Sequence, residues 1–174
     1  WFGHPGSGLL PIRGHSNVQG VGSMGVSPAL RDTFAHALDA AYDIEVDPEP
    51  GLDTFACMEA AERGAMDAAL LLGGNLFASN PDRDWAGRAM RNIGTTIALT
   101  TKLNEGHVHG RGRTSLILPV LARDEESQPT TQESMFNYVR LSEGGRPAVR
   151  GELRSEVDII ASLAEQMLPP GRFE

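Results

Sequence analysis

The sequence contains few residues that could build a metal centre or a disulfide framework. Cys57 is the single cysteine among 174 residues, so no disulfide can form within the chain. One thiol cannot complete a zinc site or hold an iron–sulfur cluster, and we expect no metal ligands in this chain. His107 and His109 are near neighbours, but no carboxylate or thiol partner at ligand spacing is evident, so a solvated loop is the simpler interpretation.

Long apolar runs and an excess of positive charge are also missing. The longest apolar run, residues 68–72, is far shorter than the roughly 20 residues that a membrane-spanning helix needs. The 15 basic and 23 acidic residues give a formal charge of −8, which would repel a nucleic acid or an anionic membrane from most of the surface. We therefore expect a soluble, cytoplasmic protein without nucleic-acid partners and without a membrane span.

The middle of the chain alternates strand and helix signals. The apolar run Met66–Leu72 ends at Gly73-Gly74-Asn75, a pattern typical of a strand that is buried on both faces and ends in a turn. Pro81 favours the start of a helix, which a second extended run, Thr95–Thr100, follows. This βαβ unit, with a third strand at 114–118, predicts the α/β class with a mainly parallel sheet.

Capping residues and helical spacing of apolar residues predict further elements on both sides of this unit. Pro28 stands at a first-turn position, and Ser155 with Asp158 resembles a capping box. The predicted elements are a loop over residues 3–25, helices at 27–42 and 52–63, an extended segment at 134–141, and a last helix that begins at Ser155 and ends before Pro169.

Two segments with polar and glycine residues follow the first two predicted strands. Gly73-Gly74-Asn75 follows the first strand, and Thr100-Thr101-Lys102 ends the second. Ligands of open α/β sheets bind beyond the carboxyl ends of the strands, so these loops should border one crevice. The glycines let a ligand approach the backbone, and a nucleotide or phosphate would fit. A plain tight turn between strand and helix remains the alternative.

Residues Gly20–Gly25 match the G-x-G-x-x-G pattern of dinucleotide-binding proteins. That fingerprint requires a buried strand directly before it, whereas residues 13–19 are polar. An independent NAD-dependent dehydrogenase is therefore the least favoured hypothesis.

Four segments, taken in order, resemble a known family. They are residues 11–25, beginning Pro-Ile-Arg-Gly-His-Ser-Asn; residues 73–82, Gly-Gly-Asn-Leu-Phe-Ala-Ser-Asn-Pro-Asp; residues 116–119, Leu-Ile-Leu-Pro; and residues 153–167. Together they resemble the catalytic alpha subunit of molybdopterin-dependent formate dehydrogenases, within the dimethyl sulfoxide reductase superfamily. The resemblance covers nearly the whole chain.

The resemblance implies that the chain is one internal domain of a longer enzyme, in keeping with a first residue, Trp1, that is not methionine. In the family this domain is Rossmann-like and three-layered, and it holds the guanosine end of one of two molybdopterin guanine dinucleotides. Residues 1–26 would be a loop segment from the cofactor region, and residues 27–174 the cofactor-binding domain. The ligands of molybdenum and of a 4Fe-4S cluster would lie outside the chain, so we expect the chain alone to be inactive.

The resemblance also carries over individual residues. Arg13 matches an arginine that orients an anionic substrate near molybdenum, and is the catalytic candidate. Glu156 stands where the family commonly has Asp, whose carboxylate would accept from the N–H groups of guanine. The candidate cofactor-binding residues are Gly14, His15, Asn17, Gly73, Gly74, Asn75, Ser79, Thr100, Thr101, Lys102 and Glu156.

The main hypothesis is therefore a cofactor-binding piece of a molybdenum oxidoreductase. The parent enzyme would oxidise a small substrate such as formate and pass electrons to iron–sulfur centres. Its partners would be the remaining domains of the longer chain and an electron-transfer subunit. A non-catalytic nucleotide-binding or regulatory α/β module is the alternative.

Overall fold

The computed structural model describes residues 3–9, 14–147 and 151–167. In chain order the elements are α1 (Val18–Ser23), α2 (Asp32–Tyr42), α3 (Thr54–Glu62), β1 (Ala68–Leu72), α4 (Leu76–Ser79), α5 (Arg83–Arg91), β2 (Thr95–Thr100), α6 (Gly106–His109), β3 (Thr114–Pro119), a short 3-10 helix (Arg123–Glu125), β4 (Thr130–Glu133), β5 (Val139–Ser142) and α7 (Glu156–Met167).

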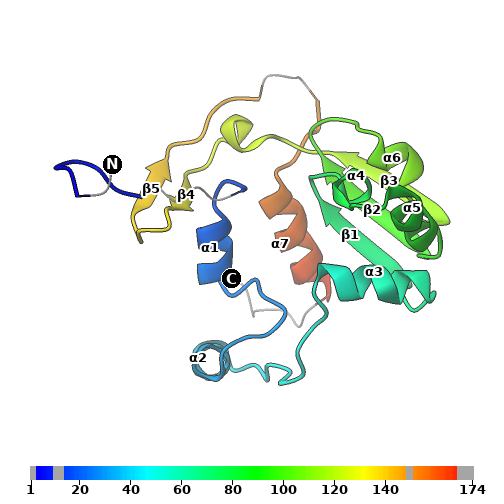
Figure 1. Ribbon diagram of the computed structural model, residues 1–174, viewed down its shortest axis with the longest axis horizontal. Coiled ribbons are helices and arrows are strands. Elements are labelled where there is room, and N and C mark those ends of the chain that lie inside the picture. Colours follow the sequence, from blue (N-terminus) through cyan, green and yellow to red (C-terminus); the bar gives the residue numbers. More distant parts are fainter. Residues whose placement is uncertain (1–2, 10–13, 148–150, 168–174) are drawn as a thin grey trace.

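A parallel sheet in the order β1-β2-β3 forms the centre of the fold. Its register places Leu70 opposite Ile97, and Ile97 opposite Leu116. Helices α4, α5 and α6 lie on one side of the sheet and α7 on the other, as Figure 1 shows. The predicted α/β, Rossmann-like class with a mainly parallel sheet is thereby confirmed.

Local capping chemistry explains why the predicted helices begin and end close to the expected residues. The Asp82 carboxylate accepts from the backbone N–H of Trp85 at 2.8 Å and starts α5. The Ser155 hydroxyl accepts from the N–H of Asp158 at 3.0 Å and starts α7, as the sequence predicted. Gly64 follows α3 with a φ of 71°, a conformation that favours glycine and ends the helix.

The hydrophobic core lies between the sheet and the pair α3 and α5. Small side chains let the two helices approach each other and the sheet, while Met90 and Ile93 fill the remaining space. The fully buried members are Met58, Ala61, Ala86, Ala89, Met90 and Ile93.

The opposite face of the sheet is only partly covered, which corrects one prediction. The first strand was expected to be buried on both faces, yet Leu70 and Leu72 are 42% and 55% exposed. Leu116 and Leu118 of β3 lie on the same face and are 49% and 40% exposed. An uninterrupted apolar run shows that a strand can be buried on both faces, but whether a second layer covers it depends on tertiary packing.

Three other elements differ from the sequence predictions. The helix expected from Ser27 begins at Asp32, because residues 27–30 form a turn in which the Ser27 hydroxyl donates to the Ala29 carbonyl at 3.1 Å. The loop expected over residues 3–25 contains α1. The extended segment expected at 134–141 is the turn and second strand of the antiparallel hairpin β4–β5.

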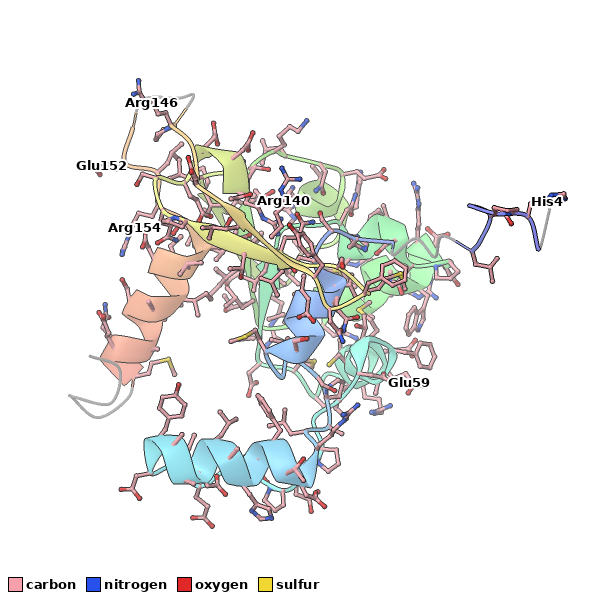
Figure 2. All side chains as sticks on the ribbon, turned by 90° about the vertical axis from the view of Figure 1, so that its left-hand side faces the viewer. His4, Glu59, Arg140, Arg146, Glu152 and Arg154 are labelled. Atoms are coloured by element: carbon pink, nitrogen blue, oxygen red, sulfur yellow. The ribbon has the colours of Figure 1, made fainter. Side chains whose placement is uncertain are left out.

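Helix α2 stands apart from the sheet in both views of the molecule (Figures 1 and 2), and none of its side chains is buried. In Figure 2, Glu152 and Arg154 lie together where the chain enters α7. Within the described ranges, no helix is long and apolar enough to cross a membrane.

Candidate functional site

The turn after β1 is shaped by two glycines in a left-handed conformation. Gly73 and Gly74 have φ values of 62° and 69°. The N–H of Gly73 still donates to the Leu99 carbonyl at 2.8 Å, so the turn continues directly from the β1–β2 ladder. A Cβ atom on Gly74 would meet nothing within 4 Å, so the backbone conformation, and not crowding, calls for glycine there.

This turn leaves polar backbone groups free at the carboxyl edge of the sheet. Among the described residues, the N–H groups of Gly74 and Asn75 have no hydrogen-bond acceptor. The Asn75 side chain is engaged locally, since its Oδ1 accepts from the N–H of Ala78 at 3.0 Å and caps α4. Two adjacent donors beside open space can receive an anionic or carbonyl oxygen of a ligand.

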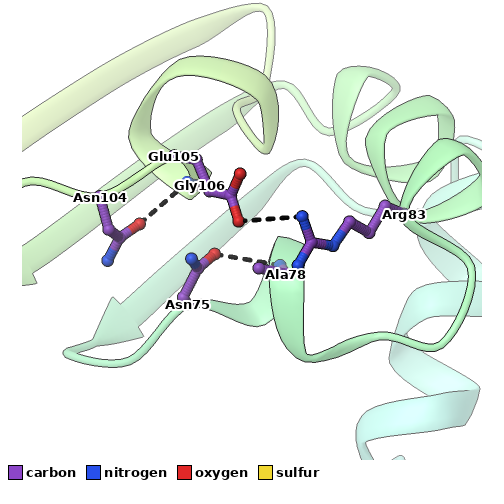
Figure 3. Close-up of polar contacts among 6 residues, drawn as sticks. All are labelled: Asn75, Ala78, Arg83, Asn104, Glu105 and Gly106. Carbon is purple, nitrogen blue, oxygen red and sulfur yellow. Dashed lines mark hydrogen bonds and ion pairs between the residues drawn. The ribbon is translucent and has the colours of Figure 1, made fainter.

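A second loop, which follows β2, is fastened to the glycine turn by Asn104. Its Nδ2 donates to the Gly74 carbonyl at 2.9 Å, and its Oδ1 accepts from the N–H of Gly106 at 2.9 Å. An ion pair of 3.2 Å between Arg83 and Glu105 joins the same loop to the first residue of α5 (Figure 3). The loops after β1 and β2 are therefore held together by side-chain contacts.

Glu156, the first residue of α7, faces the glycine turn. Its Oε1 lies 3.9 Å from the position that a Cβ atom on Gly73 would take. Burial raises the pKa of the Glu156 carboxyl above its usual 4.5, and the neighbouring Glu126 carboxylate raises it further. No hydrogen-bond donor or cation from the described residues contacts this carboxylate. A half-buried acceptor without a donor favours a ligand that supplies N–H groups.

The two residues that directly follow β3 hold the start of α7 in place. The N–H of Leu121 donates to the Arg154 carbonyl at 3.0 Å, and Val120 forms a parallel bridge with Arg154. Ser155 is 3% exposed and caps the helix. Residues far apart in sequence, Gly73 and Glu156, thus meet through the third strand.

The other predicted residues of these two loops play more local parts. The Thr100 hydroxyl is buried and donates to the Lys102 carbonyl at 2.8 Å, while Thr101 and Lys102 are exposed. Ser79 is the last residue of α4, where its hydroxyl donates to the Leu76 carbonyl at 3.3 Å. The helix expected to begin near Pro81 is α5, which begins at Arg83, and the short helix α4 lies between it and the glycine turn.

The N-terminal candidates lie elsewhere. Arg13 falls outside the described residues. Gly14 and His15 are exposed near the start of α1. Asn17 joins α1 to β4, because its Oδ1 accepts from the N–H of Glu133 at 2.8 Å and its Nδ2 donates to the Thr131 carbonyl at 3.4 Å. These two hydrogen bonds hold the Asn17 side chain at β4 and not at the glycine turn.

Two motifs considered for other chemistry have structural explanations. Gly20 and Gly22 belong to α1, and residues 14–17 before it form no strand, so the dinucleotide fingerprint lacks its context. His107 and His109 lie in α6 and not on a strand or in a solvated loop. His107 Nδ1 accepts from the N–H of Asn104 at 2.9 Å, and the His109 ring is tilted against the Phe77 ring with their centroids 5.8 Å apart. In the part of the chain that the structure describes, no group of three His, Cys, Asp or Glu side chains could hold a metal ion.

Sequence reasoning missed two residues of this site. Asn104 is not among the predicted site residues, although Asn and Gly in the same short loop are a signal for side-chain capping of backbone groups. Glu126 ends the acidic run Asp124-Glu125-Glu126, a pattern typical of a solvated loop, but its side chain is 7% exposed and its carboxylate acts on that of Glu156. Its side chain accepts from Gln128 Nε2 at 3.2 Å.

Comparisons with known proteins match nearly the whole chain to parts of longer proteins. An uncharacterized oxidoreductase of Mycobacterium tuberculosis strain H37Rv is 37% identical over 177 residues, which cover 98% of this chain and 22% of that protein. Protein YdeP of Escherichia coli K12 is 32% identical over 174 residues, covering 97% of this chain and 23% of that protein. Nearly the whole chain is thus similar to one segment of these longer proteins, the first of which is named an oxidoreductase.

These relatives are several times longer than the chain, which spans about a fifth of their length. YrhE of Bacillus subtilis, which carries a provisional formate dehydrogenase name, is 39% identical over 80 residues, or 41% of this chain and 8% of that protein. No family model matches the chain. The matches confirm the family resemblance drawn from the sequence motifs.

Proposed function

We propose that this chain is the nucleotide-binding domain of a molybdopterin-dependent oxidoreductase and holds the guanosine end of a molybdopterin guanine dinucleotide. The observation that carries the proposal is the half-buried Glu156 carboxylate, which has no donor among the described residues and lies beside the Gly73 turn. Guanine presents an N–H and an amino group side by side, and a carboxylate accepts from both in one bidentate contact.

The residues present fit such a cofactor. Glu156 would receive the guanine edge, and the free N–H groups of Gly74 and Asn75 would receive oxygen atoms of the ribose-diphosphate part. The bound molybdenum cofactor would supply two-electron redox chemistry to the whole enzyme, with iron–sulfur centres as electron acceptors. Formate, or another small oxidisable anion oriented by Arg13, is the proposed substrate class, and we propose a cytoplasmic location.

Nucleotide binding tests the local part of this proposal. We expect GDP to bind the chain more tightly than ADP in isothermal titration calorimetry, because adenine lacks the adjacent donors that Glu156 requires. Glu156→Gln should weaken GDP binding by about tenfold, the effect of one charge-assisted contact, and leave ADP binding unchanged. Equal binding of GDP and ADP by the wild-type chain would contradict the guanine assignment.

Metal analysis tests the wider part. The full-length polypeptide, purified without oxygen, should contain molybdenum, pterin and iron. A well-folded full-length protein that lacks both pterin and molybdenum would refute the oxidoreductase cofactor and leave a nucleotide-binding or regulatory module.

A further inference from the structure

A hollow of about 500 Å³ lies at the edge of the sheet opposite the glycine turn, and arginines line it. Arg91 comes from the last turn of α5, His109 from the end of α6, and Arg111 and Arg113 from the segment that enters β3. These positions adjoin the amino ends of β2 and β3. On one side the hollow adjoins the site at the glycine turn, because Arg111 and Ser115 also line a pocket that reaches Gly73, Gly74 and Asn75.

None of the arginines that line this hollow forms an ion pair with a carboxylate of the described residues. Residues 85–119 contain five arginine or lysine residues and one acidic residue, Glu105, in a chain whose net charge is −8. Glu105 is already paired with Arg83 at 3.2 Å. Among the described residues, no carboxylate lies within 4.0 Å of the guanidinium groups of Arg91, Arg111 or Arg113. Like charges gathered without counter-charges raise the energy of the free protein, and an anionic partner removes that cost.

The backbone that carries two of these arginines is rigidly placed. The N–H of Gly112 donates to the Thr96 hydroxyl at 3.1 Å, and the N–H of Arg113 donates to the Ile93 carbonyl at 3.0 Å. A Cβ atom on Gly112 would lie 2.7 Å from the Ile93 carbonyl oxygen, so only glycine fits between the two arginines. The fold fixes the Arg111-Gly112-Arg113 backbone without using either guanidinium, and both remain available for binding.

Interaction with a helix dipole explains the position of only one of the three arginines that line the hollow. Arg91 lies in the last turn of α5, where a cation interacts favourably with the helix dipole. Arg111 and Arg113 lie in the segment between α6 and β3, and no such effect applies to them. They need another explanation.

We propose that this arginine hollow docks an acidic, extended segment of a partner protein. Guanidinium groups pair with carboxylates in bidentate contacts, and several carboxylates spaced along one segment can reach three arginines at once. Val108, 60% exposed at the margin of the hollow, offers an apolar contact that a protein segment can use and inorganic phosphate cannot. A nucleic acid would extend beyond the hollow onto the acidic remainder of the surface and be repelled. This inference does not depend on the nucleotide proposal.

Peptide binding to the 174-residue chain tests the proposal. The probe is a fluorescein-labelled peptide that alternates glutamate and valine, and its partner control replaces every glutamate with glutamine. Fluorescence anisotropy at low salt should show binding of the glutamate peptide alone, and about 0.5 M salt should weaken it strongly because exposed ion pairs are screened.

Matched variants locate the contact. The double variant Arg111→Gln, Arg113→Gln should bind the glutamate peptide about tenfold more weakly, the sum of two exposed ion pairs. Arg88→Gln is the control, since it removes the same charge from the exposed surface of α5 outside the hollow. Circular dichroism verifies that each variant is folded. An equal effect of Arg88→Gln would show mere charge attraction and overturn the proposal. So would competition by inorganic pyrophosphate at the peptide's own concentration, which would identify a small-anion site.

Discussion

Replacing Asn104 by alanine should loosen the glycine turn without touching it. The substitution removes the bond from Nδ2 to the Gly74 carbonyl and the bond from the Gly106 N–H to Oδ1, both 2.9 Å long. A neutral hydrogen bond contributes about 0.5 to 1.5 kcal/mol net, and Asn104 is only half-buried, so the two together contribute about 1 to 2 kcal/mol. This free energy is lost from the contact between the loops after β1 and β2, and the packing of the core between helices and sheet is unchanged.

Native-state hydrogen exchange measures this local loss. Three amides report it: Gly106, which donates to Asn104; Ala78, which donates to Asn75; and Gly73, which donates to Leu99. If opening of the turn becomes easier by about 1 to 2 kcal/mol, these amides exchange about 5- to 30-fold faster. The amides of β2 should keep their wild-type rates.

The variant Asn104→Asp distinguishes the contributions of the two Asn104 hydrogen bonds. A carboxylate oxygen can still accept from the Gly106 N–H, but the second oxygen replaces the donor that faces the Gly74 carbonyl. Gly106 should therefore keep its protection while Gly73 and Ala78 lose theirs. If Gly106 alone changes in Asn104→Ala, and Gly73 and Ala78 keep wild-type rates in both variants, the loops are not coupled and the reasoning is refuted.

Asn92→Ala is the matched control for this experiment. The Asn92 side chain also donates to a backbone carbonyl 30 residues away, that of Glu62, at 2.8 Å. It lies after α5, at the other edge of the sheet. The control should lower the melting temperature slightly and leave exchange at Gly73 unchanged.

Three further substitutions test single features of the site and fold. Glu156→Gln should stabilise the ligand-free chain at neutral pH. Because the pKa of the Glu156 carboxyl is raised in the folded protein, the wild-type chain loses stability as pH rises from 4.5 through the raised pKa. The melting temperatures of variant and wild type should therefore converge in acid. Gly74→Ala should cost about 1 to 2 kcal/mol in urea unfolding, because φ is 69° and no clash contributes, whereas Gly22→Ala in α1 should be neutral or stabilising. Asp82→Ala should cost about 1 kcal/mol through loss of the cap on Trp85, and an unchanged urea midpoint would contradict the capping role.

The parts of the fold that were predictable from sequence are those that local patterns specify. Strand β2 occupies Thr95–Thr100 as predicted, because β-branched and apolar residues there are bounded by Gly94 and a polar loop. The caps at Asp82 and Ser155 are local as well. The hairpin β4–β5 was misplaced because β4 is polar, and its pairing with β5 depends on contacts that no periodicity records.

Helix α1 could not be predicted from the sequence either, because no local pattern specifies it. Its six residues contain two glycines, and its N-cap residue Asn17 has a left-handed φ of 59° with no side-chain cap within the helix. Asn17 instead binds the backbone of β4, more than 110 residues away. A helix stabilised by such a tertiary contact carries no local signal, so a glycine-rich loop was the natural expectation.

In the candidate site too, one part was predictable from a local pattern and another part was not. The glycine turn was found from pattern, since a strand that ends in Gly-Gly-Asn at the carboxyl edge of a sheet is a binding position on general grounds. Glu156 was found only through the family resemblance, because 83 residues separate it from Gly73 and no periodicity joins them. The structure supplies the physical link: the backbone of β3 continues to Leu121, whose N–H holds the Arg154 carbonyl and so sets α7 beside the turn. The position of Glu156 therefore depends on strand pairing at the end of the sheet. Helix packing contributes less, since Val157, Leu163 and Met167 along α7 stay 42% to 81% exposed.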